Sequence, residues 1–286
     1  MRRAWGVVLF LYGCGSADTI FPATPDAPSS SSAGWTVLAQ TDWTLQPHTE
    51  TYLCVRVTVA RDVYVGGFDP IAPLGTHHSV LGISRGTTPD GVSTCSGLFI
   101  EPSIMFGSGV GTQPLELPAG VGTKIGKGQQ VVLNLHLYNT GDAPLSGTSG
   151  VRVKEMDAAA VVNEADAMLV GPVGFTVATG LSTVNGRCTL LRNQTIFAVA
   201  PHMHKLGRHM SAQIGATMLM DRDYTFDEQT FSTIDVQVSA LEKIQTVCTY
   251  ENEGAPVGFG ESTDDEMCFL IVYRYPAGGQ FSVCSE

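Results

Sequence analysis

Alternating apolar and polar side chains predict that this chain is built mainly from short β-strands. The clearest case is Gln130 to Tyr138, where every second residue from position 131 to 137 is Val or Leu and would share one face. The opposite face would carry Asn134, His136 and Tyr138. A histidine on that more polar face is harder to explain as core filling, so His136 is a candidate functional residue.

Weaker patterns outline the rest of the chain. Strand-like alternation in Thr51 to Val65 is expected to stop at Gly66-Gly67, and the glycine-rich stretch Phe106 to Gly128 is expected to form turns. Asp157 to Ala167 is rich in alanine and is expected to cross between two domains, with room for a helical turn. In the second half, strands are expected near Phe175, Thr195 to His204, Ser211 to Met218, Phe231 to Val238 and Cys268 to Tyr275.

The composition favours an all-β fold. The 286 residues include 32 Gly and 15 Pro, 43% are hydrophobic, and no long stretch follows the helical period. These features are typical of strands joined by tight turns, and the length suits two domains, so we expect two antiparallel β-sandwich domains in tandem. The net charge of -11 argues against nucleic acid as a partner, because a phosphate backbone requires a basic face.

The N-terminus resembles an export signal. Arg2 and Arg3 precede an apolar run that ends at Leu11 and is too short to span a bilayer. Residues 1–13 are therefore expected to be a signal peptide, with Cys14 as the lipidated first residue of a bacterial lipoprotein and residues 14–35 as a flexible tether. The alternative is an ordinary signal peptide with a chance cysteine. We expect an exported lipoprotein, periplasm-facing or on the cell surface and touching the membrane only through its lipid anchor, or otherwise a secreted protein.

Six cysteines remain once Cys14 is set aside. An even number in an exported chain predicts a disulfide framework, although the number alone determines no pairing. None lies in a Cys-x-x-Cys pair, which argues against a zinc ribbon. The six are Cys54, Cys95, Cys188, Cys248, Cys268 and Cys284.

The strongest candidate site is His202-Met203-His204, which follows the apolar run Thr195 to Val199. Side chains two apart on a strand share a face, so the two imidazoles would project together and Met203 to the opposite side. Two neighbouring imidazoles are half of a metal site, and zinc or iron would suit them as well as copper. Five of the seven histidines lie in strand-associated positions, whereas His48 and His209 are expected to be ordinary surface residues.

Two further groups of residues extend this site. Met267, at the start of the last expected strand, would add an uncharged sulfur ligand, which favours soft Cu(I). His77, His78 and His136 would form a second site with nitrogen ligands only, better suited to electron transfer. Adjacent residues on a regular strand point to opposite faces, so His77 and His78 can share a metal only if the backbone bulges or turns there, which Gly75 permits. Taken singly, each signal more often marks packing or surface residues.

Several motifs occur in a fixed order and cover nearly everything from about residue 36 to the end. They are Thr76-His77-His78-Ser79-Val80-Leu81, Leu117-Pro118-Ala119-Gly120-Val121-Gly122, Leu133-Asn134-Leu135-His136-Leu137-Tyr138-Asn139, Ser149-Gly150-Val151-Arg152, His202-Met203-His204-Lys205-Leu206-Gly207 and Asp265-Glu266-Met267-Cys268. In this order they resemble the copper type II, ascorbate-dependent monooxygenases, which include peptidylglycine α-hydroxylating monooxygenase and dopamine β-monooxygenase.

The resemblance implies two jelly-roll-like β-sandwich domains, residues 36–160 and 161–286, that face each other across a solvent-filled cleft. Each domain would hold one of two copper ions. A reductant such as ascorbate would reduce both ions, and O2 would bind at the methionine-ligated one, where a substrate C–H bond is hydroxylated. The implied ligands are His77, His78 and His136 for the electron-transferring copper, and His202, His204 and Met267 for the catalytic copper.

The cysteine positions of the family further imply three disulfides. The pairs are Cys54 with Cys95, Cys188 with Cys284, and Cys248 with Cys268, the last beside the sulfur ligand. We expect the protein to be a monomer.

Departures from the family pattern bear on the substrate. Peptide-hydroxylating members carry an arginine that grips a substrate carboxylate where this chain has Ala200, and they carry Asn and Tyr where it has Phe269 and Ile271. These replacements make the wall of the site apolar, so we expect a small, uncharged or aromatic substrate rather than a C-terminal glycine peptide. Asn134 replaces a common glutamine, which leaves any role in electron delivery open.

Two other functions compete with a monooxygenase. A copper-binding lipoprotein could store or sense the metal without catalysis, although a store needs no matched pair of unlike sites. A ligand-binding β-sandwich with structural histidines would bind no copper.

Overall fold

The computed structural model describes residues 34–84, 86, 88–95, 103–278 and 283–286. The expected signal peptide, Cys14 and residues 15–33 of the expected tether lie outside the described residues. We refer to residues 34–164 as the first half and to residues 165–286 as the second half. Within the described ranges no helix is long and apolar enough to cross a membrane.

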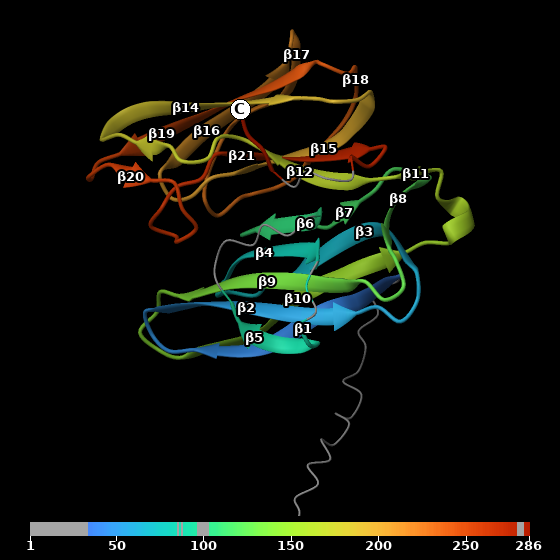
Figure 1. Ribbon diagram of the computed structural model, residues 1–286. Coiled ribbons are helices and arrows are strands. Elements are labelled where there is room, and N and C mark those ends of the chain that lie inside the picture. Colours follow the sequence, from blue (N-terminus) through green and yellow to red (C-terminus); the bar gives the residue numbers. More distant parts are fainter. Residues whose placement is uncertain (1–33, 85, 87, 96–102, 279–282) are drawn as a thin grey trace, which may run out of the picture. The chain divides into compact units, whose positions relative to one another are not determined.

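The first half consists of two sheets (Figure 1). One contains, in spatial order, β1 (Trp35–Leu45), β10 (Leu145–Glu155), β3 (Val63–Ile71), β8 (Val121–Ile125) and β11 (Asn163–Glu164), with β7 (Leu115–Glu116) beside β3. The other contains β5 (Gly91–Thr94), β2 (Thr49–Thr58), β9 (Gln130–Asn139), β4 (Thr76–Ile83) and β6 (Ser103–Gly109). Among the described residues, one 3-10 turn, η1 (Ala158–Ala160), lies between β10 and β11, and the Asp157 side chain accepts a hydrogen bond from Ala159 N.

The second half is built mainly from antiparallel strand pairs, with parallel pairing at its C-terminal strand and at a bridge between Phe259 and Glu266. One contains β18 (Ser232–Val238), β15 (Gln194–His202), β21 (Phe269–Tyr275), β12 (Asp166–Val170) and β22 (Val283–Cys284). The next contains β14 (Gly180–Thr189), β19 (Lys243–Asn252), β16 (Gly207–Ile214) and β17 (Thr217–Asp223), and β13 (Thr176–Val177) pairs with β20 (Val257–Gly258). The expected all-β fold is confirmed; the jelly-roll arrangement and the boundary after residue 160 stay predictions.

The strand predicted over Gln130 to Tyr138 is confirmed as β9, but the expected break at Gly66-Gly67 is wrong. Strand β3 runs through both glycines, because their missing side chains make room for a neighbour. A Cβ at Gly67 would lie 2.9 Å from Cη2 of Trp35. The glycines therefore serve close packing across the sheet, which local composition does not distinguish from a turn.

The turns predicted over Phe106 to Gly128 are also wrong in part, since β6 and β8 occupy much of this stretch. Gly109 ends β6 at a close contact, where a Cβ would lie 2.4 Å from Oε1 of Gln229 in the second half. Contact with a distant residue therefore explains this glycine within a strand.

The hydrophobic core of the first half continues into the second half. Phe106 on β6 packs in one cluster with residues of β15 and β21, including Phe197 and Tyr273. The amide of Gly107 donates a hydrogen bond to the Tyr273 hydroxyl over 3.3 Å. A separate core, which includes Met203 and Tyr250, contains buried side chains from the two large sheets of the second half. The halves therefore meet through buried apolar side chains.

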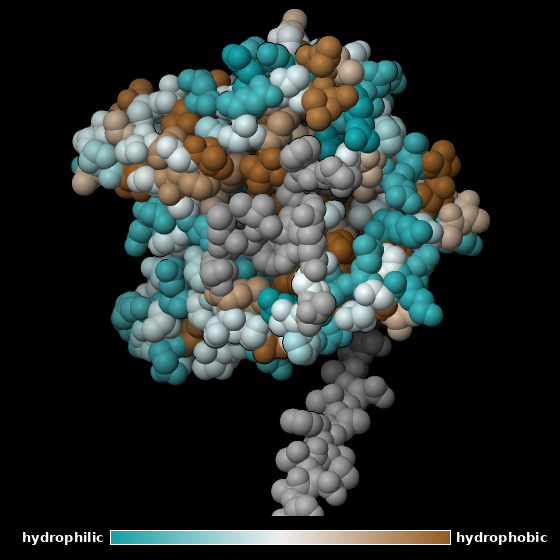
Figure 2. All heavy atoms as spheres, viewed as in Figure 1, coloured by the Kyte–Doolittle hydropathy of each residue, from teal (hydrophilic) through white to brown (hydrophobic). Residues whose placement is uncertain are grey.

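Three disulfides join the pairs that the family resemblance implies. They are Cys54–Cys95, Cys188–Cys284 and Cys248–Cys268. Such bonds persist in oxidising compartments, so they fit an extracellular or periplasmic protein. The outer face seen in Figure 2 mixes hydrophilic and hydrophobic residues.

Candidate metal centre

Strand β4 presents two adjacent histidines to one site because its backbone is irregular there. The pairing of β4 with β9 shifts register between Thr76 and His78, so the strand bulges at His77. Gly75 just upstream has a φ of 97°, which residues with a Cβ rarely adopt. The irregularity that the adjacent histidines require is therefore confirmed, and both imidazoles lie against that of His136 on β9.

These three imidazoles form a compact group in the first half. Each offers a ring nitrogen within 4.8 Å of the nitrogens of the other two, and Nδ1 of His77 lies 2.8 Å from Nδ1 of His136. His77 and His136 are buried. Nε2 of His77 and Nδ1 of His78 are buried without a hydrogen-bond partner among the described residues. Buried polar atoms are normally paired, so these nitrogens are candidate metal donors.

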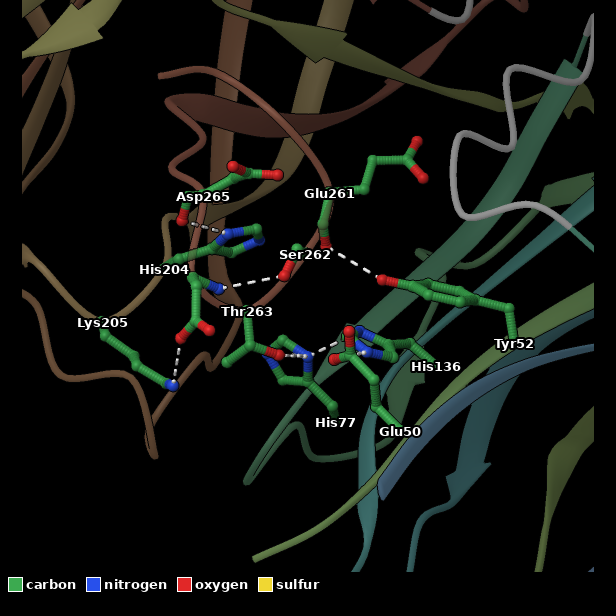
Figure 3. A network of polar contacts seen from close by, with 11 residues as sticks. Glu50, Tyr52, His77, His136, His204, Lys205, Glu261, Ser262, Thr263 and Asp265 are labelled. Carbon is green, nitrogen blue, oxygen red and sulfur yellow. Dashed lines mark hydrogen bonds and ion pairs between the residues drawn. The ribbon is translucent and has the colours of Figure 1, made fainter. Parts of the chain in front are cut away.

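Neighbouring residues hold His136 and His77 from outside the group (Figure 3). Glu50 Oε2 lies 3.0 Å from Nε2 of His136, and the Tyr52 ring stacks on the His136 ring at 4.2 Å. Thr263 Oγ1, from the second half, lies 3.4 Å from Nδ1 of His77. The sequence analysis did not identify Glu50 and Tyr52, which share a face of β2 beside β9. The alternation of side chains along β2 is the one signal that could have indicated them.

The second half brings His202 and His204 near each other. β15 ends at His202, two residues before the expected end at His204, and the ring centroids of His202 and His204 are 5.4 Å apart. Met203 points to the opposite side, into the core of the second half, where the Tyr224 hydroxyl donates to its carbonyl. Nδ1 of His204 lies 2.9 Å from the carbonyl oxygen of Asp265, which can only accept, so Nδ1 carries the proton. Nε2 of His204 is then a buried lone pair without a partner among the described residues.

Glu266 joins the segment from His204 to Leu206 to the segment that carries Met267. Its two carboxylate oxygens accept hydrogen bonds from the amides of His204 (3.0 Å) and Leu206 (2.7 Å). Burial raises the pKa of Glu266 to about 7. This buried carboxylate has no counterpart in the sequence analysis beyond its place in the motif Asp265-Glu266-Met267-Cys268.

Met267 lies two residues before β21, not at its first position, and is buried. The Tyr250 hydroxyl donates to its carbonyl over 2.6 Å, and the neighbouring Cys268 is bonded to Cys248 on β19. Met267 lines a cavity together with His202. A hydrogen bond and a disulfide therefore fix the backbone on which the thioether is carried.

Histidines of the two halves lie in contact rather than across an open cleft. The ring centroids of His77 and His204 are 5.8 Å apart, and those of His78 and His202 are also 5.8 Å apart. The solvent-filled separation that the family resemblance implies is therefore not what this structure has at the histidines. The apolar contact between β6 and β21 holds the two sets together.

A cavity of about 310 Å³ opens beside His78 and His202. Its walls are mostly apolar and include Ala200, Phe269 and Ile271, the three positions at which the sequence departs from the peptide-hydroxylating pattern. Among the described residues that line it, Glu261 is the only acid and there is no Lys or Arg. Burial raises the pKa of Glu261 to about 7.

All five imidazoles are held in the neutral form. Burial lowers the pKa of His77 to about 2 and that of His204 to about 3, with neighbouring histidines adding to the shift. Burial likewise lowers the pKa values of His78, His136 and His202. Neutral imidazole is the form that binds metals. The remaining histidines are at the surface, as predicted: His48 lies 2.9 Å from Asp142 and His209 lies 3.0 Å from Asp221.

The second half matches a known protein family. Residues 161–286 match the family model described as copper type II ascorbate-dependent monooxygenase, C-terminal domain. Among solved structures, the chain is similar to the crystal structure of dimeric latent PorU from Porphyromonas gingivalis, with 9% identity and a TM-score of 0.22. That alignment covers 82% of this chain but only 24% of the PorU chain, and a likeness this weak carries no argument about fold or function.

Proposed function

Because residues 161–286 match the family model of the copper type II ascorbate-dependent monooxygenase C-terminal domain, we propose that this protein is a copper-dependent monooxygenase. It hydroxylates a substrate C–H bond with O2 and a one-electron reductant such as ascorbate. The observation that carries the proposal is the pairing of two unlike buried donor sets. One set has three imidazoles, and the other has the two imidazoles of His202 and His204, of which His202 lines a cavity together with Met267.

The residues present fit copper. In this proposal His77, His78 and His136 hold one ion, and His202, His204 and Met267 hold the other. The unpaired ring nitrogens of His77, His78 and His204 are the donors that a metal would satisfy. Imidazole with a thioether suits copper in both oxidation states, and bound copper would supply the one-electron chemistry and the activation of O2.

The protein's own contribution is to fix these donors. Glu50 faces Nε2 of His136, and the Asp265 carbonyl holds a proton on Nδ1 of His204, so each imidazole is turned with its other nitrogen inward. Such outer partners orient metal-binding histidines and raise their basicity. Because the halves meet at the histidines, the two donor sets lie next to each other.

The cavity supports a small, uncharged or aromatic substrate. Ala200, Phe269 and Ile271 offer apolar contact beside His202, and no basic side chain among the described lining residues would neutralise a carboxylate. We further propose that the protein acts as a monomer exported by its N-terminal segment and anchored through Cys14.

The test is ascorbate-dependent O2 consumption by copper-loaded protein with a panel of neutral aromatic compounds and carboxylate-bearing peptides. Met267→Leu removes the sulfur at nearly constant volume, a change that usually costs under about 1.5 kcal/mol of stability. We expect it to abolish product formation, whereas Met218→Leu at an exposed position leaves the rate unchanged.

Copper binding without O2 consumption on any substrate would favour a storage or sensing protein. Absence of bound copper would favour a sandwich with structural histidines. Hydroxylation of carboxylate-bearing peptides alone would contradict the proposed substrate class.

A further inference from the structure

Gln229 lies between the two halves and contacts one of the proposed copper ligands. It is buried, and its Oε1 lies 2.9 Å from Nδ1 of His202. We propose that Gln229 is a positioning residue that selects the tautomer of His202. Through Gln229, the first half of the chain controls the metal site of the second half. The inference about metal rests on the proposed function, whereas the tautomer is a property of the metal-free chain.

Hydrogen bonds determine which way the Gln229 amide faces. Its Nε2 lies 3.1 Å from the carbonyl oxygen of Phe226, which can only accept, so the amide nitrogen must face Phe226. Oε1 therefore faces His202 and can only accept. His202 must then carry its proton on Nδ1, and its Nε2 keeps the lone pair that a metal requires. The Asp265 carbonyl selects the same tautomer for His204.

The backbone of Gln229 is held by the first half. Its amide donates to the carbonyl of Val110 over 3.1 Å, and its carbonyl accepts from the Thr112 hydroxyl over 2.9 Å. The same hydroxyl accepts from the amide of Gly109 at the end of β6. The loop after β6 thus binds the main chain of Gln229, and the side chain of Gln229 contacts His202.

Gly109 leaves no spare room at this contact. An added Cβ would lie 2.4 Å from Oε1 and 2.6 Å from Cδ of Gln229, so the amide would have to move away from His202. Gly107, two residues earlier on β6, offers a matched comparison. A Cβ there would meet only Cδ1 of Ile271, at an ordinary 3.7 Å. The two positions therefore separate the effect on Gln229 from a general effect on the strand.

The first experiment measures the ring nitrogens of His202 by long-range ¹H–¹⁵N NMR in the metal-free full-length chain at pH 8. His202→Gln assigns the signals, and the His204 signals serve as an internal control. We expect wild-type His202 to be protonated on Nδ1, Gln229→Leu to give a mixture of tautomers, and Gln229→Glu, which keeps an acceptor, to restore the Nδ1 proton. A proton on Nε2 in the wild type, or an unchanged signal in Gln229→Leu, overturns the proposal.

The second experiment compares Gly109→Ala with Gly107→Ala by the same measurement. We expect Gly109→Ala to shift the His202 signals toward the Gln229→Leu pattern and Gly107→Ala to leave them in place. Equal effects of the two substitutions overturn the control by the first half.

Copper titration adds a readout of the metal site. Loss of an outer partner typically weakens metal affinity about 10–100-fold, and we expect this at one of two copper ions in Gln229→Leu. A changed tautomer with unchanged copper binding would contradict the proposed metal site but leave the tautomer assignment standing. An unchanged tautomer contradicts the further inference whatever the copper result.

Discussion

The imidazole rings of His77 and His204 lie 5.8 Å apart, although one belongs to each half of the chain. Both are buried, and burial holds both in the neutral form. Metal ions bound by two sets of histidines this close would repel each other, because the buried protein around them screens charge poorly. The contact therefore makes the two proposed copper sites one connected unit.

Binding of two Cu(II) ions is expected to be anticooperative. Coulomb repulsion scales with the product of the charges, so it is about four times smaller for two Cu(I) than for two Cu(II). We expect a copper ion in one site to weaken Cu(II) binding at the other site, and to weaken Cu(I) binding less. Isothermal titration with competing chelators measures both steps.

Single-site variants provide the control for this titration. His136→Ala and His204→Ala each keep one of the two unlike sites, and the second Cu(II) step of the wild type should be weaker than binding to the weaker of these two variants. The exposed variant His48→Ala should bind two ions. A second wild-type Cu(II) step as strong as binding to the weaker single-site variant would contradict the connected arrangement.

Glu266→Gln is expected to destabilise the fold by about 1–3 kcal/mol. The glutamine oxygen can accept from only one of the amides of His204 and Leu206, which leaves the other buried N–H facing an amide NH2 group. Urea unfolding of copper-free protein measures the change. Glu251→Gln removes an exposed partner of Arg208 instead, and such surface pairs contribute about 0–1 kcal/mol. Similar losses in both variants would contradict the role given to Glu266.

Removal of the Cys248–Cys268 bond is expected to cost about 3 kcal/mol in the chain-entropy model, since it closes a loop of 20 residues. Replacing both cysteines by alanine should also loosen Met267 and weaken the proposed methionine-ligated site. Removing Cys188–Cys284, which spans 96 residues, should cost more, about 4–5 kcal/mol, and leave that site less affected. Thermal unfolding and copper affinity measure the two effects separately.

The stability of the protein is expected to fall with rising pH through Glu261. Burial raises the pKa of this carboxyl from 4.5 to about 7, so the folded state holds the proton more tightly than the unfolded state. This stabilising contribution is complete below pH 4.5 and is lost as pH rises through about 7. Relative to Glu261→Gln, the wild type should therefore lose free energy of unfolding between those values, as measured by urea unfolding of copper-free protein. A difference independent of pH would contradict the shift.

Local pattern alone predicted β9 and the strand that leads to His202, because alternating apolar residues need no distant partner to be recognised. The candidate residues were likewise visible, since adjacent histidines on a strand already demand a bulge, and β4 has one at His77. Gly67 and Gly109 were misjudged for the opposite reason. Each is glycine because a side chain from elsewhere, Trp35 or Gln229, occupies the space of a Cβ.

The sequence by itself determined the all-β class, the identity of the candidate ligands and, with the family resemblance, the cysteine pairs. Only the tertiary structure decided that histidines of both halves lie in contact, and that Glu50, Gln229 and Glu266 hold the candidate ligands in place. The physical reason is distance along the chain. The period of apolar residues and the spacing of motif residues describe the strand on which a residue lies. A hydrogen bond such as that between Gln229 and His202 depends instead on how the sheets pack.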